Sequence, residues 1–359
     1  MKKQVRRLTD YLTYAASKTI SMDLPRDGVI TELLLEWYLV LSGAIVGASE
    51  DIFGRLIGNG LEITGPGNKK YYSITDGRMA QWLDHFTNQK GVTAPNVITA
   101  ATTTTAYFVQ RIHFGSQPYN PDGSPNPFDL TCGVPGNTLR DGQLSSLKLK
   151  WISPANTVCD PGTSGKTIGT TTTCKVTVFE VLDANPMTVP AMEEVDWAAD
   201  AAYSNLGKKW DFPTGVYVKS VTVLANDHTA FSAGTGCGDI RKDDQVTELA
   251  VQLPKEGNRA VIQYAVEDLK AQCQVAPAFF GNESTYGATA SAVWQHGAPI
   301  GAYHVDFRKY TDPAVFAQGY FYGLDQLNKQ PGNLKLAMTI GSYTSGDDVK
   351  ILWEEMSPF

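Results

Sequence analysis

The sequence predicts an all-β protein in which one domain is present twice in tandem. Three observations support this fold class: segments of the first half recur in the second, apolar residues alternate with polar ones over short runs, and Gly, Pro and Asn separate those runs. Alternation with a period of two is typical of half-buried strands, and turn residues between such runs are typical of all-β domains. The predicted elements therefore come in two matching sets.

The repeat keeps nearly one offset over more than a hundred residues, which identifies it as a duplication and excludes chance similarity. The offsets are 188, 190 and 187 residues for three matched pairs: Asp23-Leu24-Pro25 with Asp211-Phe212-Pro213, Gly67-Asn68-Lys69 with Gly257-Asn258-Arg259, and LKLKWIS from Leu147 with LKLAMTI from Leu334.

Alternating runs predict the strands of each copy. Leu, Met and Ile occupy every second position of 334–340, and Leu and Trp do so in the counterpart 147–151. Each copy closes on another alternating run, around Val176 and Val178 in the first and over 349–353 in the second. One face of each run is apolar, so each strand should cover a core.

A Gly-Asn turn is expected to join two strands in the middle of each copy, and a short helix should follow. The predicted helices span Asp76–Phe86 and Val266–Cys273. The two copies meet in a segment with two prolines and a stretch that we interpret as helical. The predicted domains are 1–21 (a basic arm), 22–182 (the first sandwich), 183–209 (a linker) and 210–359 (the second sandwich).

The N-terminus predicts a helical arm added to the duplicated fold. Its apolar residues recur at helical spacing, so residues 4–17 could form a short amphipathic helix with a basic start. The four basic residues are Lys2, Lys3, Arg6 and Arg7. We interpret them as facing an anionic membrane or genome, with a solvated terminus as the alternative. A chain starting at Ser21 should then still fold.

Composition limits the function classes. Apolar residues make up 42% and charged residues 19%, which suits globular domains, and the net charge of -7 argues against a protein that coats nucleic acid. The first apolar stretch, Leu33–Gly47, comes too late for a secretory signal and is too short to cross a bilayer, so we expect a soluble chain.

No constellation typical of chemistry is apparent, so we expect no catalytic residue, no cofactor and no metal site. Cys159 and Cys174 bracket a loop and could close a disulfide, although two reduced thiols are the favoured alternative. The histidines are isolated, and we interpret the carboxylate doublets, such as Glu354-Glu355, as solvated turns and ends. Asn282 begins a glycosylation sequon.

Together these elements predict two tandem eight-stranded jelly-roll β-sandwiches with short accessory helices and an N-terminal helical arm. This arrangement resembles the double jelly-roll major capsid proteins, the lineage of tectivirus coat proteins and adenovirus hexon. The resemblance spans residues 22–353 and rests on DLPRDGVITELLL, RLIGNGLEITGPGNKKYYSITDGRMAQWL and LKLKWIS with CKVTVFEVL, together with their second-copy partners.

The resemblance implies a non-enzymatic capsid protein of the virion, made in the host cytoplasm. It implies a homotrimer whose six jelly rolls form a pseudo-hexagonal capsomer of an icosahedral shell, in contact with neighbouring capsomers, penton and minor capsid proteins. Inner membrane lipid or the genome would be reached through the N-terminal arm. The alternative is a two-jelly-roll protein that binds or processes glycans, for which the aromatic residues Phe279, Phe280, Tyr286 and Trp294 would be the binding surface.

Overall fold

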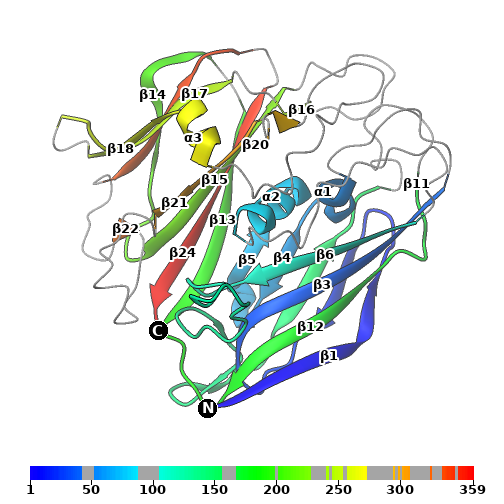
Figure 1. Ribbon diagram of the computed structural model, residues 1–359. Coiled ribbons are helices and arrows are strands. Elements are labelled where there is room, and N and C mark those ends of the chain that lie inside the picture. Colours follow the sequence, from blue (N-terminus) through cyan, green and yellow to red (C-terminus); the bar gives the residue numbers. More distant parts are fainter. Residues whose placement is uncertain are drawn as a thin grey trace.

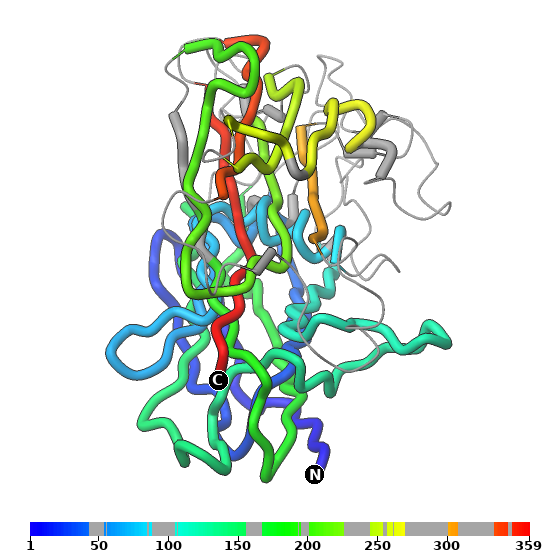
Figure 2. The backbone as a smooth tube through the Cα atoms, turned by 90° about the vertical axis from the view of Figure 1, so that its left-hand side faces the viewer, coloured from blue at the N-terminus to red at the C-terminus, as the bar shows by residue number. Residues whose placement is uncertain are grey.

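The computed structural model is drawn in Figures 1 and 2. It describes residues 1–42, 52–87, 105–155, 167–198, 201–227, 240–241, 245–253, 257–272, 294–295, 298–299, 301–307, 324–325, 334–343 and 347–359. The two halves lie side by side, and both chain ends lie at the lower end of the molecule in Figure 2.

The first half forms two antiparallel sheets. The six-stranded sheet contains β1 (Lys2–Thr13), β3 (Val29–Ser42), β6 (Thr105–His113), β7 (Val134–Pro135), β11 (Thr167–Ile168) and β12 (Thr173–Leu182). The four-stranded sheet contains β2 (Thr19–Asp23), β4 (Leu61–Thr64), β5 (Lys70–Ile74) and β10 (Lys148–Ile152).

The second half repeats this pair of sheets. Its six-stranded sheet contains β13 (Thr188–Ala198), β15 (Tyr217–Asp227), β16 (Ile240–Arg241), β21 (Ala302–Asp306), β22 (Leu324–Asp325) and β24 (Asp348–Pro358). Its four-stranded sheet contains β14 (Tyr203–Asp211), β17 (Val246–Leu253), β18 (Arg259–Ala265) and β23 (Lys335–Ile340).

The remaining elements are short. They are the helices α1 (Ile52–Ile57), α2 (Gly77–Thr87) and α3 (Val266–Gln272), a 3-10 turn (Pro66–Asn68), and the two-stranded pairs β8 (Asn137–Thr138) with β9 (Gly142–Gln143) and β19 (Trp294–Gln295) with β20 (Ala298–Pro299). Both predicted helices are confirmed, apart from Cys273, which lies outside the described residues.

Strand order confirms the predicted fold class. Among the described residues each half has eight strands of at least four residues. Their orders are β1-β12-β3 with β6 beyond and β2-β10-β4-β5 in the first half, and β13-β24-β15 with β21 beyond and β14-β23-β17-β18 in the second. In each half the first strand lies beside the last, and successive long strands alternate between the two sheets except for one hairpin within the four-stranded sheet, β4–β5 in the first half and β17–β18 in the second. This is the jelly-roll arrangement.

Turn chemistry confirms the duplication in detail. Gly67 and Asn68 have φ of 63° and 61°, and Gly257 and Asn258 have φ of 71° and 61°. Positive φ at two successive positions is what a tight hairpin requires, and Gly and Asn tolerate it. The Asp-x-Pro segments also match, because the backbone N–H after each Asp, in Leu24 and Phe212, donates to the first Leu of the matched runs, Leu147 and Leu334.

The predicted helical arm is wrong. Residues 2–13 form strand β1, which pairs with β12 from Lys2 opposite Leu182 to Thr13 opposite Thr173. Leu12 is fully buried, whereas Val5 is 55% exposed, so the apolar residues do not form one helical stripe. The pairing groups of β12 and a core position for Leu12 favour the extended chain, so the first sandwich begins at Lys2 and not at residue 22.

The predicted helix in the linker is also wrong. Residues 188–198 form β13, paired with β24 along its whole length, and β14 starts at Tyr203. Pro190 is tolerated because β13 is the outer strand of its sheet. Strands β13 and β14 occupy in the second sheets the places that β1 and β2 occupy in the first, so the N-terminal strand does have a counterpart.

The main cluster of the described core runs through both halves, and a small separate cluster of Leu206, Ala250 and Ala337 lies in the second half. In the first half Trp37 and Trp151 meet edge to face with ring centroids 4.9 Å apart, and the Trp151 Nε1–H donates to the Ile57 carbonyl. In the second half Phe212 lies 5.7 Å from Trp353. Buried aromatic pairs of this kind contribute about 0.5–1.5 kcal/mol beyond the area they bury.

Candidate functional site: the joint between the two sandwiches

The two sandwiches meet at a joint that uses different surfaces of each. The second half contributes one face of its six-stranded sheet, and the first half contributes β5 and α2 (Figure 1). Strand β13 lies along β5, and α2 contacts β15 and β21. The joint is therefore head to tail, and it sets the position of one sandwich on the other.

A carboxylate of the second half is bound at the start of α2. Glu194 on β13 accepts hydrogen bonds from the Thr75 N–H and Oγ1, both at 2.7 Å, and from the Asp76 N–H at 3.2 Å. These backbone groups precede a helix and point outward, so they suit an anion. Burial raises the pKa of Glu194, and the nearby Asp76 raises it further.

Asp76 links both halves from the other side. Its carboxylate accepts from Arg78 Nη2 at 2.8 Å and lies 3.2 Å from the Lys350 Nζ on β24. Burial alone would raise the pKa of Asp76, but Arg78 and Lys350 outweigh burial and hold it far below its usual range. The carboxylate is therefore ionised and paired across the joint.

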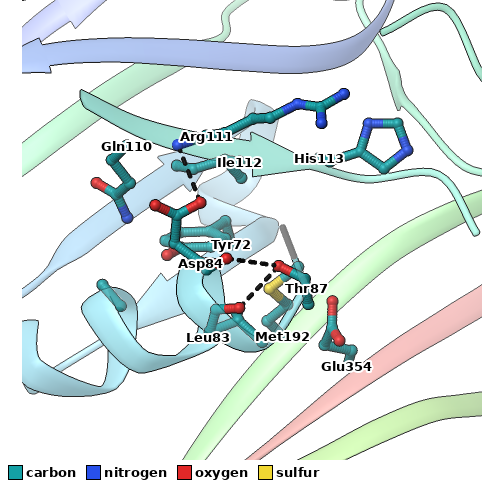
Figure 3. A pocket seen from close by; sticks show the side chains of 11 residues that line it. Tyr72, Leu83, Asp84, Thr87, Gln110, Arg111, Ile112, His113, Met192 and Glu354 are labelled. Atoms are coloured by element: carbon teal, nitrogen blue, oxygen red, sulfur yellow. Dashed lines mark hydrogen bonds between the residues drawn. The ribbon is translucent and has the colours of Figure 1, made fainter. Parts of the chain in front are cut away.

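Figure 3 shows a small polar hollow beside this contact, and its walls come from both halves. Tyr72, Asp84 and Gln110 line it from the first half, and Met192 and Glu354 from the second. Its volume of about 10 Å³ is the space of one water molecule, too small for an organic substrate. The hollow suits structural hydration of the joint.

A buried ion cluster stands next to the hollow. The Glu32 carboxylate lies 2.6 Å from the Arg111 Nη2 and 2.9 Å from the His113 Nδ1. Asp129, which accepts backbone N–H groups of Gln117 and Thr131, lies 3.9 Å from the His113 Nε2. The cluster attaches the loop that starts at Gly115 to strands β3 and β6.

Burial alone would raise the pKa of Glu32, but hydrogen bonds from His113 and Arg111 outweigh it and hold that pKa below its usual value. The loop that starts at Gly115 is therefore held by charge pairs that are sheltered from solvent. Removing one partner of such a buried ion pair strongly destabilises the fold, because the other charge is left unpaired.

The prediction that the doublet Glu354-Glu355 is a solvated end is wrong, because both side chains are buried. The Glu354 carboxylate accepts a hydrogen bond from Lys219 Nζ at 3.0 Å and another from the Ser220 hydroxyl. Burial alone would raise the pKa of Glu354, but Lys219 and Ser220 together lower it. A bulge at Lys219 brings its ammonium to the same side of the sheet as Glu354.

The comparison with solved structures decides the fold. The STIV MCP, from the Sulfolobus turreted icosahedral virus, superposes with a TM-score of 0.66 and 13% identity, covering 100% of this chain and 97% of its own. The chain is a double jelly roll. The PBCV-1 virus capsid (TM-score 0.56, 12% identity, 99% and 95% covered) and the major capsid protein of bacteriophage PM2 (0.52, 12%, 100% and 98%) are similar over the same length.

No protein-family model and no curated protein matches the sequence of this double jelly roll. The likeness therefore lies in the fold. The glycan-binding alternative gains no support, since Phe279, Phe280 and Tyr286 lie outside the described residues and Trp294 lies in the short strand β19.

The predicted basic site residues lie on β1 of the double jelly roll and are divided. Arg6 pairs with Asp27 at 2.6 Å and with Glu180 at 3.2 Å, and Arg7 pairs with Glu36 at 2.5 Å. The Lys3 Nζ lies 5.2 Å from the ring centroid of Phe128, and Lys2 is exposed. The structure does not bring the four together as one basic surface, because successive residues of a strand point to opposite faces of the sheet. Their contact with a membrane or genome stays a prediction.

The predicted disulfide falls partly outside the described residues, since Cys159 lies there. Cys174 is a buried free thiol on β12, and burial raises its pKa well above the usual value. Cys132 is also free and buried, and burial raises its pKa to about 12. Such thiols are unreactive.

Among the described residues, no group of three or more His, Cys, Asp and Glu is arranged to hold a metal ion. Within the same residues, no helix has the length and apolar character to cross a membrane. The sequon at Asn282 lies outside the described ranges. The joint was not predicted from the sequence, because its charged residues Glu194, Asp76 and Lys350 come together from separate parts of the chain.

Proposed function

We propose that this chain is the major capsid protein of an icosahedral virus. It forms homotrimers, each a pseudo-hexagonal capsomer of six jelly rolls, which contact neighbouring capsomers, penton and minor capsid proteins above an internal membrane. It is made in the host cytoplasm and resides in the virion. The observation that carries the proposal is the double jelly-roll fold over the full chain, shared with capsid proteins of icosahedral viruses.

The joint supports this role. A capsomer with two rolls per chain needs the rolls held at one fixed angle, and the joint supplies a buried apolar contact with ion pairs on both sides. The hollow of Figure 3 takes about one water, which suits hydration of a structural contact.

The exposed end of β1 supports the membrane part of the proposal. Lys2 and Lys3 lie at the chain end, and each basic residue near an anionic surface contributes about 1 kcal/mol. Two such residues on one subunit bind weakly, but a shell presents many copies, which multiplies the effect.

The mass of the purified protein tests the capsomer. Sedimentation equilibrium at micromolar concentration should give about 117 kDa, three times 39.0 kDa. A chain that stays monomeric at that concentration would contradict the proposal, since stable obligate interfaces bury about 2,000 Å² or more.

A further inference from the structure

The joint leaves two matching surfaces unused. It joins the β13-β24-β15 face of the second roll to β5 and α2 of the first. Because the rolls are duplicates, the first roll has an equivalent face on β1-β12-β3, and the second has an equivalent edge at β18 and α3. In Figure 1 these two surfaces lie at opposite ends of the pair, β1 and β12 at the lower right and β18 and α3 at the upper left.

Strand register fixes which residues correspond on the sheet faces. The β12–β3 ladder has its bulge next to Glu180, and the β24–β15 ladder has its bulge next to Glu355. Counting from those bulges, Lys175 takes the place of Lys350. The pairings of β1 and β13 with these strands then put Arg7 in the place of Glu194.

The same register fixes the edges. The β4–β5 and β17–β18 ladders carry a bulge at the same step, so Ser73 corresponds to Gln263, and the start of α2 corresponds to the start of α3. Ser73 is 7% exposed in the joint, whereas Gln263 is exposed. The edge that the joint covers in the first roll is therefore open in the second.

The unused sheet face carries exposed aromatic side chains. Tyr11, Tyr38 and Tyr107 are 51%, 44% and 60% exposed, and Tyr38 and Tyr107 stand directly opposite each other on β3 and β6. The Lys175 Nζ lies 5.3 Å from the ring centroid of Tyr11. Clustered exposed aromatics on a soluble protein mark an interaction surface.

The two surfaces differ in charge. Arg7 and Lys175 stand on the sheet face beside Glu36, which pairs with Arg7 at 2.5 Å, and Glu267 and Asp268 are exposed in the first turn of α3. In the joint the equivalent sheet positions hold Glu194 and Lys350, which bind the start of α2. Arg7 therefore stands on the unused face where Glu194 stands in the joint. The helix that Arg7 would meet, α3, begins with the acidic residues Glu267 and Asp268.

We propose that the β1-β12-β3-β6 face of one subunit docks on β18 and α3 of a second copy of this chain, with Arg7 and Lys175 facing Glu267 and Asp268. This inference rests on the proposed capsomer and specifies its subunit contact. The contact is head to tail, and repeating it closes a ring of three when each copy is rotated by one third of a turn. A trimer then contains six similar joints, three within chains and three between them.

Charge reversal tests the contact. The variants are Arg7→Glu/Lys175→Glu and, on the other surface, Glu267→Lys/Asp268→Lys; the matched control is Lys18→Glu/Lys148→Glu, at exposed residues off both surfaces. Sedimentation at low salt should show trimer dissociation constants raised at least tenfold for each of the first two and unchanged for the control. Circular dichroism reports whether each variant is folded, and Arg7→Gln/Lys175→Gln replaces the first variant if reversal unfolds it.

The chain with all four reversals decides the matter, because the contact between subunits then pairs opposite charges again, while the Arg7–Glu36 pair within each chain is lost equally in the double and the quadruple variant. We expect it to regain the trimer. If the wild type is a trimer but reversal changes nothing, or the four reversals fail to restore it, the proposed contact is wrong while the capsomer stands. A monomeric wild type would instead overturn the capsomer itself.

Discussion

At the scale of single residues, the buried charges are what the sequence could not predict. His113 was interpreted as isolated and Glu354 as solvated, because a sequence shows residue types but not the partners that other strands bring. Glu32 meets Arg111 only because β3 pairs with β6, some eighty residues later. By contrast, the Gly67-Asn68 turn was predictable, because its conformation depends on the two residues themselves.

We expect Glu32→Gln to destabilise the fold by about 3–5 kcal/mol at pH 7, because it leaves the buried Arg111 guanidinium without its anion. The pKa of Glu32 is depressed in the fold, so its stabilisation is present above the unfolded pKa and is lost as pH falls. Urea unfolding at pH 7 and pH 3.5 should therefore show a smaller difference from wild type at the lower pH.

The control for that experiment is Glu62→Gln, which removes an ion pair to Lys70, whose side chain is 52% exposed, and a longer contact of 3.7 Å to Lys150. Exposed pairs contribute about 0–1 kcal/mol. Equal losses in the free energy of unfolding would show that the buried Glu32 cluster stabilises the fold no more than the ion pair of Glu62 does.

At the scale of elements, alternation and turn signals predicted most strands, but the N-terminal strand was predicted to be a helix. Val5, Leu8 and Leu12 fit helical spacing, yet they lie on strand β1. A bulge between Arg7 and Tyr11 shifts the register of β1 against β12 and interrupts the alternation of inward and outward residues. A short apolar pattern cannot decide between the two periods by itself. The partner strand β12 decides, and it lies far along the chain.

Deleting residues 1–18 should impair folding, contrary to the expectation for a removable arm. The deletion uncovers the ladder of β12 and removes Leu12 from the core, and losing one buried Leu alone costs about 2–5 kcal/mol. Soluble yield and the thermal midpoint measure the effect. A truncated chain with an unchanged midpoint would contradict the assignment of β1 to the sandwich.

Membrane contact by the chain end is tested without disturbing β1. Lys2→Gln/Lys3→Gln should lower salt-sensitive binding to anionic vesicles, with Lys18→Gln as the control and neutral vesicles as the blank. The thermal midpoint should not change, since both side chains are exposed. Binding equal to that of the wild type would leave the basic end as an ordinary solvated terminus.

At the scale of the whole molecule, duplication was predictable and the joint was not. Matched offsets along one chain fix the two folds but carry no information on how the rolls meet, which depends on Glu194, Asp76 and Lys350 converging from separate strands. The same convergence explains why this chain holds two rolls as one body with a continuous core.

Glu194→Ala/Lys350→Ala should loosen the joint while leaving each roll folded. Hydrogen exchange at β5 and α2 should become faster, because these elements lose their bonds to the second roll. Asp211→Ala breaks an exposed pair with Lys335 within the second roll and should leave that exchange unchanged. Unchanged exchange in the double variant would mean that apolar packing alone holds the joint.

The central claim is that three copies of this double jelly roll build one pseudo-hexagonal capsomer. Single-particle electron microscopy of the purified oligomer tests it most directly. The account predicts a three-fold particle with six roll-sized lobes, in which the joint within each chain and the contact between chains look alike. A particle without three-fold symmetry, or a two-lobed single chain, would contradict it.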